Sequence, residues 1–410
     1  MNNVKFRLII MNFLQFFIWG SWLISLGGYM GGSLHFEGGQ IGAIFATMGI
    51  ASLFMPGLMG IVADKWLNAE RLLGLCHIVG AVLLFSASTV TDYTTMYWIL
   101  LLNMMVYMPT LALVNTVSYN ALEKHGMDVV KDFPPIRVWG TVGFICAMWA
   151  VDLSGIARSN AQLFVASGAA LLLGLYSFTL PACPPSARGE RKSLMSALGL
   201  DALVLFKQKK MAIFFLFSML LGAALQITNT FGGSFLDSFK AIPEFEHSFG
   251  VEHPNILLSI SQMSETLFIL AIPFFLGRFG IKNVMLMSMF AWVLRFGFFG
   301  IGDPSAGGMV WLILSMIVYG MAFDFFNISG SLFVEKSTTP EIRASGQGLF
   351  MMMTNGFGAV IGGYASGAVV DYFTKNGVTD WPACWYAFAA YALVIGILFA
   401  LVFKYKHEHA

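Results

Sequence analysis

Apolar segments of about 20 residues recur along the whole chain, and they constrain its fold more than any other feature does. Of the 410 residues, 57% are hydrophobic and 11% are charged, whereas a soluble globular domain carries about 25% charged residues. Segments of this length and polarity cross the hydrocarbon core of a bilayer as α-helices. The sequence therefore predicts an all-α membrane protein that crosses the lipid bilayer many times.

Twelve transmembrane helices are predicted from the apolar segments. We place them at residues 6–28, 41–62, 72–90, 96–117, 135–153, 162–180, 212–236, 256–276, 284–302, 309–334, 344–373 and 381–403. They divide into an N-terminal six-helix half (1–183) and a C-terminal six-helix half (211–410), which a basic central loop (184–210) connects. Leu194, Leu198 and Leu205 alternate with polar residues in this loop, so it is either an amphipathic surface helix or a solvated tether.

The positive charges assign an orientation to this layout. Of 23 Lys and Arg residues, 19 fall in the terminal segments and the loops on the N-terminal side of the membrane. Only Arg158, Lys240 and Lys375 fall on the opposite side, and Arg295 lies within a span. Because cytoplasmic loops are enriched in Lys and Arg, both termini are predicted to be cytoplasmic.

Several classes of function are disfavoured by the sequence. A net charge of +1 gives no electrostatic basis for binding nucleic acid. The four cysteines are scattered, so no metal site is indicated, and there is no P-loop motif for direct use of ATP. No catalytic cluster lies near a membrane face, which argues against an enzyme. No cofactor and no obligatory protein partner are expected.

Asp324 lies near the middle of the predicted span 309–334. A carboxylate at that depth costs about 2.5–3.5 kcal/mol on insertion scales, so it is rare unless it faces a water-filled cavity, a partner or a substrate. Glu265 is placed similarly in span 256–276. Ionisable residues within a membrane are functional by default, so both acids are candidates for proton transfer during solute transport.

Other polar residues recur at helical spacing, which places each pair on one helix face. Gln262 lies three residues before Glu265, and Asn327 three residues after Asp324. Gln226 and Asn229 show the same spacing in span 212–236. Hydrogen bonds between helices account equally well for a single Asn or Gln, so these amides alone do not establish a binding site.

Three further polar residues lie within the predicted spans. Arg137 lies two residues after Pro135 and either faces a cavity or extends to the cytoplasmic surface. Arg295 lies deeper, and we expect it to form a structural pair with a carboxylate. His77 is expected to be a hydrogen-bonded core histidine.

A weak internal repeat points to a superfamily. Residues 60–65 fit the pattern GxxxD-[RK], and residues 277–282 in the matching loop of the second half keep its glycine and its basic character. Together with six plus six helices and a basic central loop, these motifs resemble the major facilitator superfamily. Proteins of that fold bind their substrate near the bilayer midplane between the halves.

Longer segments resemble a specific family, the bacterial nucleoside:proton symporters. The segments that carry the resemblance are FLQFFIWGSW (13–22), DFPPIRVWGT (132–141), LQITN (225–229), SQMSET (261–266), GMAFDFFNISG (320–330) and the tail FKYKH (403–407). The chain departs from enteric members of the family at Ala224, where they carry an acidic residue.

The resemblance implies an inner-membrane permease that imports nucleosides with protons. It also implies a central cavity to which nine residues contribute: Arg137, Thr141, Phe144, Gln226, Asn229, Gln262, Glu265, Phe323 and Asp324. An aromatic ring stacks on a nucleobase while amides read its edge. Desolvation disfavours a buried carboxylate, so Asp324 or Glu265 is expected to take up the proton, and Arg137 to pair with the deprotonated acid on the return step. From composition alone, a proton-coupled sugar or oligosaccharide symporter of the same fold is the alternative.

Overall fold

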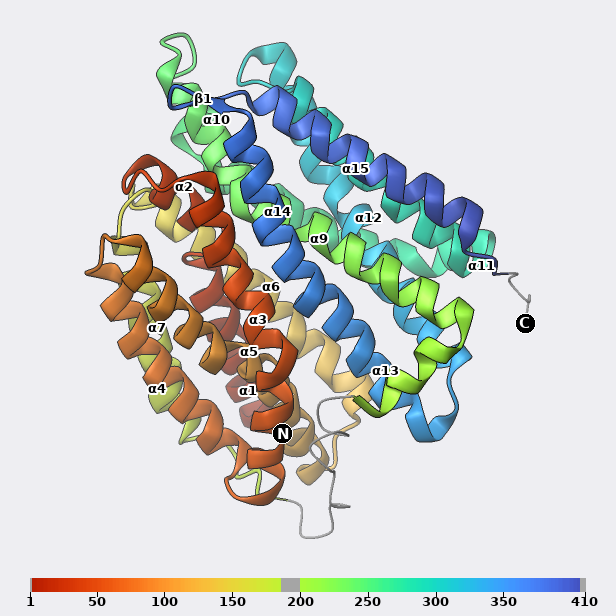
Figure 1. Cartoon of the computed structure of the whole chain (residues 1–410). Coiled ribbons are helices and arrows are strands. Elements are labelled where there is room, and N and C mark those ends of the chain that lie inside the picture. The colour runs from red at the N-terminus through yellow and green to blue at the C-terminus, as the bar shows by residue number, and fades with distance from the viewer. Residues whose placement is uncertain (1, 186–199, 406–410) are drawn as a thin grey trace. The chain divides into compact units, whose positions relative to one another are not determined.

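The computed structural model describes residues 2–185 and 200–405, and its elements are helical apart from one short hairpin (Figure 1). The helices of the first part are α1 (Asn2–Gly20), α2 (Leu26–Gly32), α3 (Gly38–Lys65), α4 (Ala69–Ser88), α5 (Tyr93–Lys124), α6 (Val129–Leu153) and α7 (Ala161–Ser177). The later elements are η1 (Leu200–Lys207), α9 (Lys209–Ser238), η2 (Phe239–Ala241), α10 (Phe249–Glu252), α11 (Pro254–Ile301), α12 (Ala306–Ser337), α13 (Pro340–Met351), η3 (Met352–Gly358), α14 (Ala359–Tyr372), β1 (Thr374–Lys375), β2 (Val378–Thr379) and α15 (Trp381–Val402).

Each predicted span coincides with helical structure, and eight of the described helices are long and apolar enough to cross a membrane. Helix α11 covers two predicted spans. It is interrupted at Gly280, whose φ of 76° and ψ of 165° are not helical. This backbone conformation favours glycine because it has no Cβ. The break falls between the predicted end at residue 276 and the predicted start at residue 284. The total of twelve membrane crossings stays a prediction.

Several helix ends lie a few residues from the predicted boundaries, and two predicted spans differ from the structure for an evident local reason. The first span is two helices, since α1 ends at Gly20 and α2 begins at Leu26. The Ser21 hydroxyl donates to the main-chain oxygen of Phe17 at 2.8 Å, and such bonding to a preceding turn often bends a helix. Helix α6 begins at Val129, six residues before the predicted start. Pro134 and Pro135 lie inside it and remove main-chain hydrogen bonds near its start without ending it.

The described chain divides into two compact units. Unit 1 comprises Met1–Leu34 and Ile50–Leu198, and unit 2 comprises His35–Gly49 and Gly199–Ala410. The division falls inside α3, whose first part groups with unit 2. Of the central loop, residues 186–199 lie outside the described residues, and Leu194 and Leu198 with them. Residues 200–207 form η1, in which Ala202 and Leu205 are buried.

Glycines bring the helices of unit 2 into close contact. A Cβ atom at Gly362 would lie 2.5 Å from the main-chain oxygen of Ala223 in α9, and one at Gly49 would lie 2.7 Å from that of Gly356. Small residues permit this approach of backbones in membrane helices. As a result α9 and α14 run side by side (Figure 1). The glycines of segment 344–373 thus allow close helix approach.

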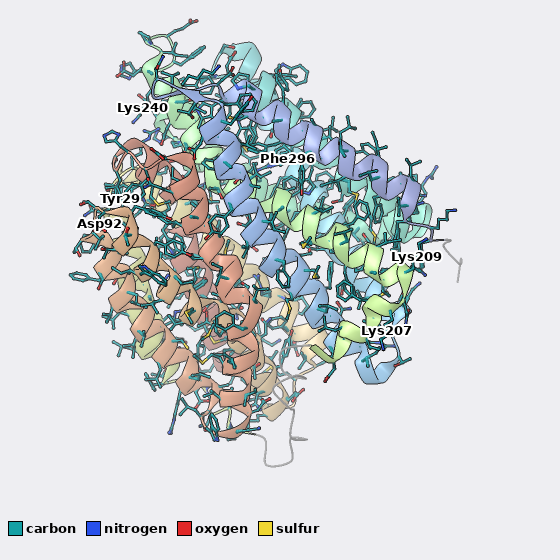
Figure 2. The ribbon with its side chains drawn as sticks, viewed as in Figure 1. Tyr29, Asp92, Lys207, Lys209, Lys240 and Phe296 are labelled. Atoms are coloured by element: carbon teal, nitrogen blue, oxygen red, sulfur yellow. The ribbon has the colours of Figure 1, made fainter. Side chains whose placement is uncertain are left out.

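The core of unit 2 is aromatic. The Phe296 ring stacks on Trp385 with centroids 6.1 Å apart, and Phe299 lies 4.8 Å from the same indole. At the two ends of α9, basic side chains mark the boundary of the apolar region: Lys207 and Lys209 lie at one end and Lys240 at the other (Figure 2).

Candidate functional site

In unit 1, Arg137, Thr141 and Phe144 descend one face of α6 at steps of four and three residues. The guanidinium carbon of Arg137 lies 4.0 Å from the centroid of the Phe16 ring in α1. Gly140 leaves room for it, because a Cβ there would lie 2.7 Å from the Arg137 Nη1 atom. Since α6 begins at Val129, Arg137 lies more than two turns into the helix. Arg137 is half-buried and lies over an aromatic ring. This position favours the prediction that it faces a cavity over the prediction that it extends to the cytoplasmic surface.

Aromatic side chains continue this face of unit 1. The Trp19 indole lies edge-on to Phe144, with centroids 6.4 Å apart at 83°, and 5.6 Å from the Tyr107 ring. Within residues 2–185 and 200–405, the buried Trp19 Nε1 atom has no hydrogen-bond acceptor. The arrangement offers ring faces and an indole donor beside Phe144.

A closed network of hydrogen bonds lies behind these rings. The Gln15 Nε2 atom donates to Thr110 Oγ1 at 2.7 Å, and the Thr110 hydroxyl donates to the Tyr107 main-chain oxygen at 2.5 Å. The Gln15 Oε1 atom is therefore the acceptor for His77 Nε2 at 2.7 Å. Tyr107 donates its hydroxyl to the Gln15 main-chain oxygen at 2.8 Å. The prediction that His77 is a hydrogen-bonded core histidine is confirmed.

In unit 2, α12 and the first part of α11 bring the two predicted acids together. Asp324 is 4% exposed, and no described residue donates a hydrogen bond to its Oδ2 atom. It interacts electrostatically with Glu265, which is half-buried. Two carboxylates held this close repel each other when both are charged. Protonation of one of the two acids therefore removes this electrostatic repulsion.

The predicted amides of unit 2 come from α9 and α11. Gln226 is buried, and its Oε1 atom accepts no hydrogen bond from the described residues. Asn229 and Gln262 are half-buried. Their side chains therefore retain hydrogen-bonding capacity for a solute.

Tyr319 is a residue that the sequence reasoning missed. Its ring is parallel to that of Phe323, with centroids 5.8 Å apart and planes 5° apart. Its hydroxyl hydrogen-bonds with the Gln262 side chain and lies in the electrostatic field of Glu265 and Asp324. Its position four residues before Phe323 was the available signal, since residues four apart share a helix face.

Arg295 does not form the carboxylate pair expected from the sequence. Its Nη1 atom donates to Ser261 Oγ at 3.2 Å and to the Ser315 main-chain oxygen at 2.9 Å. Its guanidinium carbon lies 4.5 Å from the centroid of the Tyr319 ring. Within the described part of the chain no carboxylate pairs with it. A planar, weakly hydrated guanidinium interacts well with an aromatic face, so the stack of Tyr319 and Phe323 also contacts the Arg295 guanidinium.

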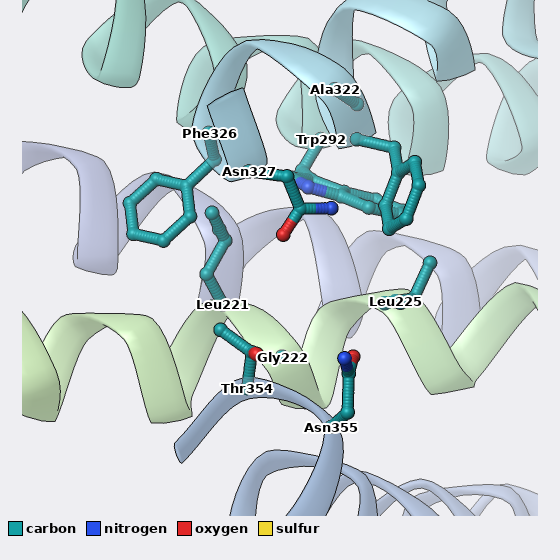
Figure 3. A pocket seen from close by; sticks show the side chains of 10 residues that line it. Leu221, Gly222, Leu225, Trp292, Ala322, Phe326, Asn327, Thr354 and Asn355 are labelled. Carbon is teal, nitrogen blue, oxygen red and sulfur yellow. The ribbon is translucent and has the colours of Figure 1, made fainter. Parts of the chain in front are cut away.

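One pocket of unit 2 adjoins this stack (Figure 3). Its space amounts to about 270 Å³, which includes the open space at its mouth. Its lining consists of Leu221, Gly222, Leu225, Trp292, Ala322, Phe323, Phe326, Asn327, Thr354 and Asn355. Of the nine predicted site residues, only Phe323 lines it. The described residues contain no group of three His, Cys, Asp or Glu side chains that could hold a metal ion.

Comparison with known proteins gives matches along almost the whole chain. A family model described as nucleoside H+ symporter matches residues 1–408. The chain is 56% identical over 405 residues to the nucleoside permease NupG of Escherichia coli K12, covering 99% of this chain and 97% of that protein. It is 59% identical over 406 residues to the xanthosine permease of the same organism, with the same coverage.

Solved structures agree with these matches. The crystal structure of the nucleoside transporter NupG superposes with a TM-score of 0.94 at 56% identity, covering 98% of this chain and 100% of that one. A peptide transporter of the POT family superposes with a TM-score of 0.72 at 14% identity, covering 97% and 94% of the two chains. At that identity the second match bears on the fold alone.

Proposed function

Because this chain belongs to the nucleoside H+ symporter family, we propose that it carries nucleosides and protons together into the bacterial cell by alternating access. Its fold is the major facilitator fold predicted from the sequence. The observation that carries the proposed mechanism is the burial of Asp324 beside Glu265 in unit 2.

The two acids provide the proton site. Burial and mutual repulsion both disfavour a state in which Asp324 and Glu265 are charged together. A proton taken from the outer side removes this penalty and permits the conformational change that carries the solute inward. Release of the proton on the cytoplasmic side restores the charge, and Arg137 then pairs with the deprotonated acid during the return.

In this proposal, aromatic rings and polar side chains together hold the nucleoside. Phe144 and Phe323 offer ring faces to the base, and Arg137 and Thr141 offer donors to its edge. The amides of Gln226, Asn229 and Gln262 bind the remaining polar atoms, and the acids accept from ribose hydroxyls. Tyr319 supports Phe323 through their parallel contact of 5.8 Å. The combination of stacking and edge-reading groups is the one that recognises nucleobases.

The orientation follows from the positive charges. Lys207, Lys209 and Lys336 lie at helix ends assigned to the cytoplasm, whereas Lys240 lies at the far end of α9. Since cytoplasmic loops are enriched in Lys and Arg, we place both termini in the cytoplasm of an inner membrane protein.

Competition for binding tests the solute class. Purified protein would be incubated with labelled uridine and an excess of unlabelled adenosine, xanthosine, maltose or lactose. We expect nucleosides to displace the label and sugars to leave it bound. Displacement by a sugar at a concentration at which nucleosides have no effect would instead establish the sugar symporter.

A further inference from the structure

The pocket of unit 2 contains two amides that the proposed transport site does not use. Asn327 enters it from α12 and Asn355 from η3, on the opposite wall (Figure 3). Asn327 lies three residues beyond Asp324, about one helical turn closer to the end of α12 that carries Lys336. Asn327 itself is therefore displaced from Asp324 toward the side assigned to the cytoplasm, whereas Ala322 and Phe323 of the same pocket precede Asp324 in α12.

Both amides are available to a ligand. Asn327 forms no hydrogen bond with any described residue. Asn355 has only a contact of 3.6 Å between its Nδ2 atom and the Met351 sulfur. The neighbouring Thr354, by contrast, is satisfied, because its hydroxyl donates to the Phe350 main-chain oxygen at 3.0 Å. Half-buried amides without protein partners are costly in a membrane protein, which favours a role in binding water or solute.

The backbone that carries Asn355 is specialised. Residues Met352–Gly358 form a π-helix between α13 and α14, and such segments are rare and frequent at functional sites. Gly222 of α9 packs against this segment so closely that a Cβ there would collide with the main-chain oxygen of Thr354. The π-helix and this contact together fix Asn355 in the wall of the pocket.

The remaining walls are suited to an aromatic heterocycle. Trp292, Phe323 and Phe326 supply rings, and Leu221 and Leu225 supply apolar surface on α9. Amides with one donor and one acceptor group each, set among aromatic faces, match the requirements of a nucleobase. The hollow of about 270 Å³ includes the open space at its mouth, so its walls contact one edge of a base and leave the ribose outside.

We propose that Asn327 and Asn355 form a release-side contact site that shares Phe323 with the transport site, and that the base of the nucleoside reaches these amides after it leaves the acids. This inference rests on the proposed function. It predicts that the two amides control how fast nucleosides pass through the carrier, and only weakly how tightly they bind at Asp324.

Nucleoside exchange across proteoliposome membranes tests this site. Asn327→Leu and Asn355→Leu keep the side-chain shape and remove the hydrogen bonds, whereas Asn327→Ala and Asn355→Ala remove the hydrogen bonds and leave the pocket larger. We expect all four to slow uridine exchange about five- to ten-fold, the effect of losing one hydrogen bond, while equilibrium uridine binding changes less than two-fold. Asn283→Ala is the matched control, because Asn283 is exposed and donates to its own helix at the Phe279 oxygen.

The analogue 3-methyluridine identifies the contact, because it lacks the N3–H donor. We expect wild type to exchange it more slowly than uridine, and the variants to exchange both at the same reduced rate. Variants that fold, bind uridine and exchange both nucleosides at wild-type rates would overturn the release-side contact site, and so would slowing by Leu but not by Ala, which indicates blockage. Wild-type protein that neither binds nor exchanges uridine would instead contradict the proposed function.

Discussion

The polar cluster around Gln15 in unit 1 and the cluster around Asp324 in unit 2 differ in how far the protein satisfies its own groups. In the first, Gln15, His77, Thr110 and Tyr107 form a network in which each side chain bonds to another member. In the second, Asp324 keeps an oxygen that no described residue bonds, and it faces another acid. Satisfied polar groups hold a helix bundle together, and unsatisfied ones are available to a proton or a solute.

The largest expected effect on transport comes from removing the charge of Asp324. One proton moved through 100 mV supplies about 2.3 kcal/mol, which supports roughly 40-fold accumulation of solute. We expect Asp324→Asn to abolish this accumulation in proteoliposomes and to retain nucleoside exchange. Asp303→Asn is the control, since Asp303 lies in the loop after α11 and accepts from the Ser305 main-chain nitrogen. Accumulation at the wild-type level in Asp324→Asn would remove this acid from the coupling mechanism, and Glu265→Gln would then be the decisive variant.

Loss of the buried cation beside that cluster is expected to have an intermediate effect. Arg295→Gln removes the guanidinium that contacts Tyr319, and a desolvated cation–π contact is worth about 2 kcal/mol. We expect the melting temperature to fall by several degrees and nucleoside binding to weaken about three- to ten-fold, because the Tyr319 and Phe323 rings lose their support. The exposed Arg278→Gln serves as the control. A variant with lower stability and unchanged affinity would show that Arg295 supports the fold without positioning the rings.

Disruption of the hydrogen-bond network around Gln15 should affect the stability of the protein and leave transport unchanged. Hydrogen bonds between membrane helices contribute about 0.6 kcal/mol on average, so we expect Gln15→Leu and His77→Leu to lower the melting temperature by a few degrees. Nucleoside accumulation at saturating substrate should be unchanged. If His77→Leu instead lost accumulation at unaltered melting temperature, the contrast between the two clusters would be wrong.

The smallest effect is expected at a site that belongs to neither cluster. Asp92 is the N-cap of α5 and accepts from the Thr95 main-chain nitrogen at 2.9 Å, which holds the pKa of its carboxyl below the ordinary value of 3.8. A lowered pKa means that the stabilisation is present at neutral pH and is lost as the pH falls below 3.8. We expect Asp92→Ala to lower the melting temperature by about one or two degrees at pH 7 and to leave it unchanged in strong acid. A difference in melting temperature between wild type and Asp92→Ala that persists in strong acid would contradict a stabilising role of the charged Asp92 carboxylate.

Hydropathy was sufficient to locate the helices. The cost of burying a carboxylate in a membrane span was sufficient to single out Asp324 and Glu265 as candidates. Apolar length decides whether a segment spans a membrane, and a carboxylate within such a segment is conspicuous without knowledge of its neighbours. The prolines of α6 were misleading, because a rule for helix starts was applied where the helix tolerates them internally.

Contacts between distant segments could not be read from the sequence. Arg295 is held by Ser261 and Ser315 and lies over Tyr319. These residues come from separate helices or helix segments, whose proximity no local pattern encodes. The π-helix at Asn355 likewise packs against Gly222, which lies in a distant segment of the chain.

Uptake of labelled uridine into proteoliposomes, with and without an imposed inward proton gradient, tests the central claim most directly. The account predicts that internal uridine rises above the external concentration only when the gradient is present. Uptake that reaches the same equilibrium level under both conditions, with folded protein in the membrane, would contradict proton coupling.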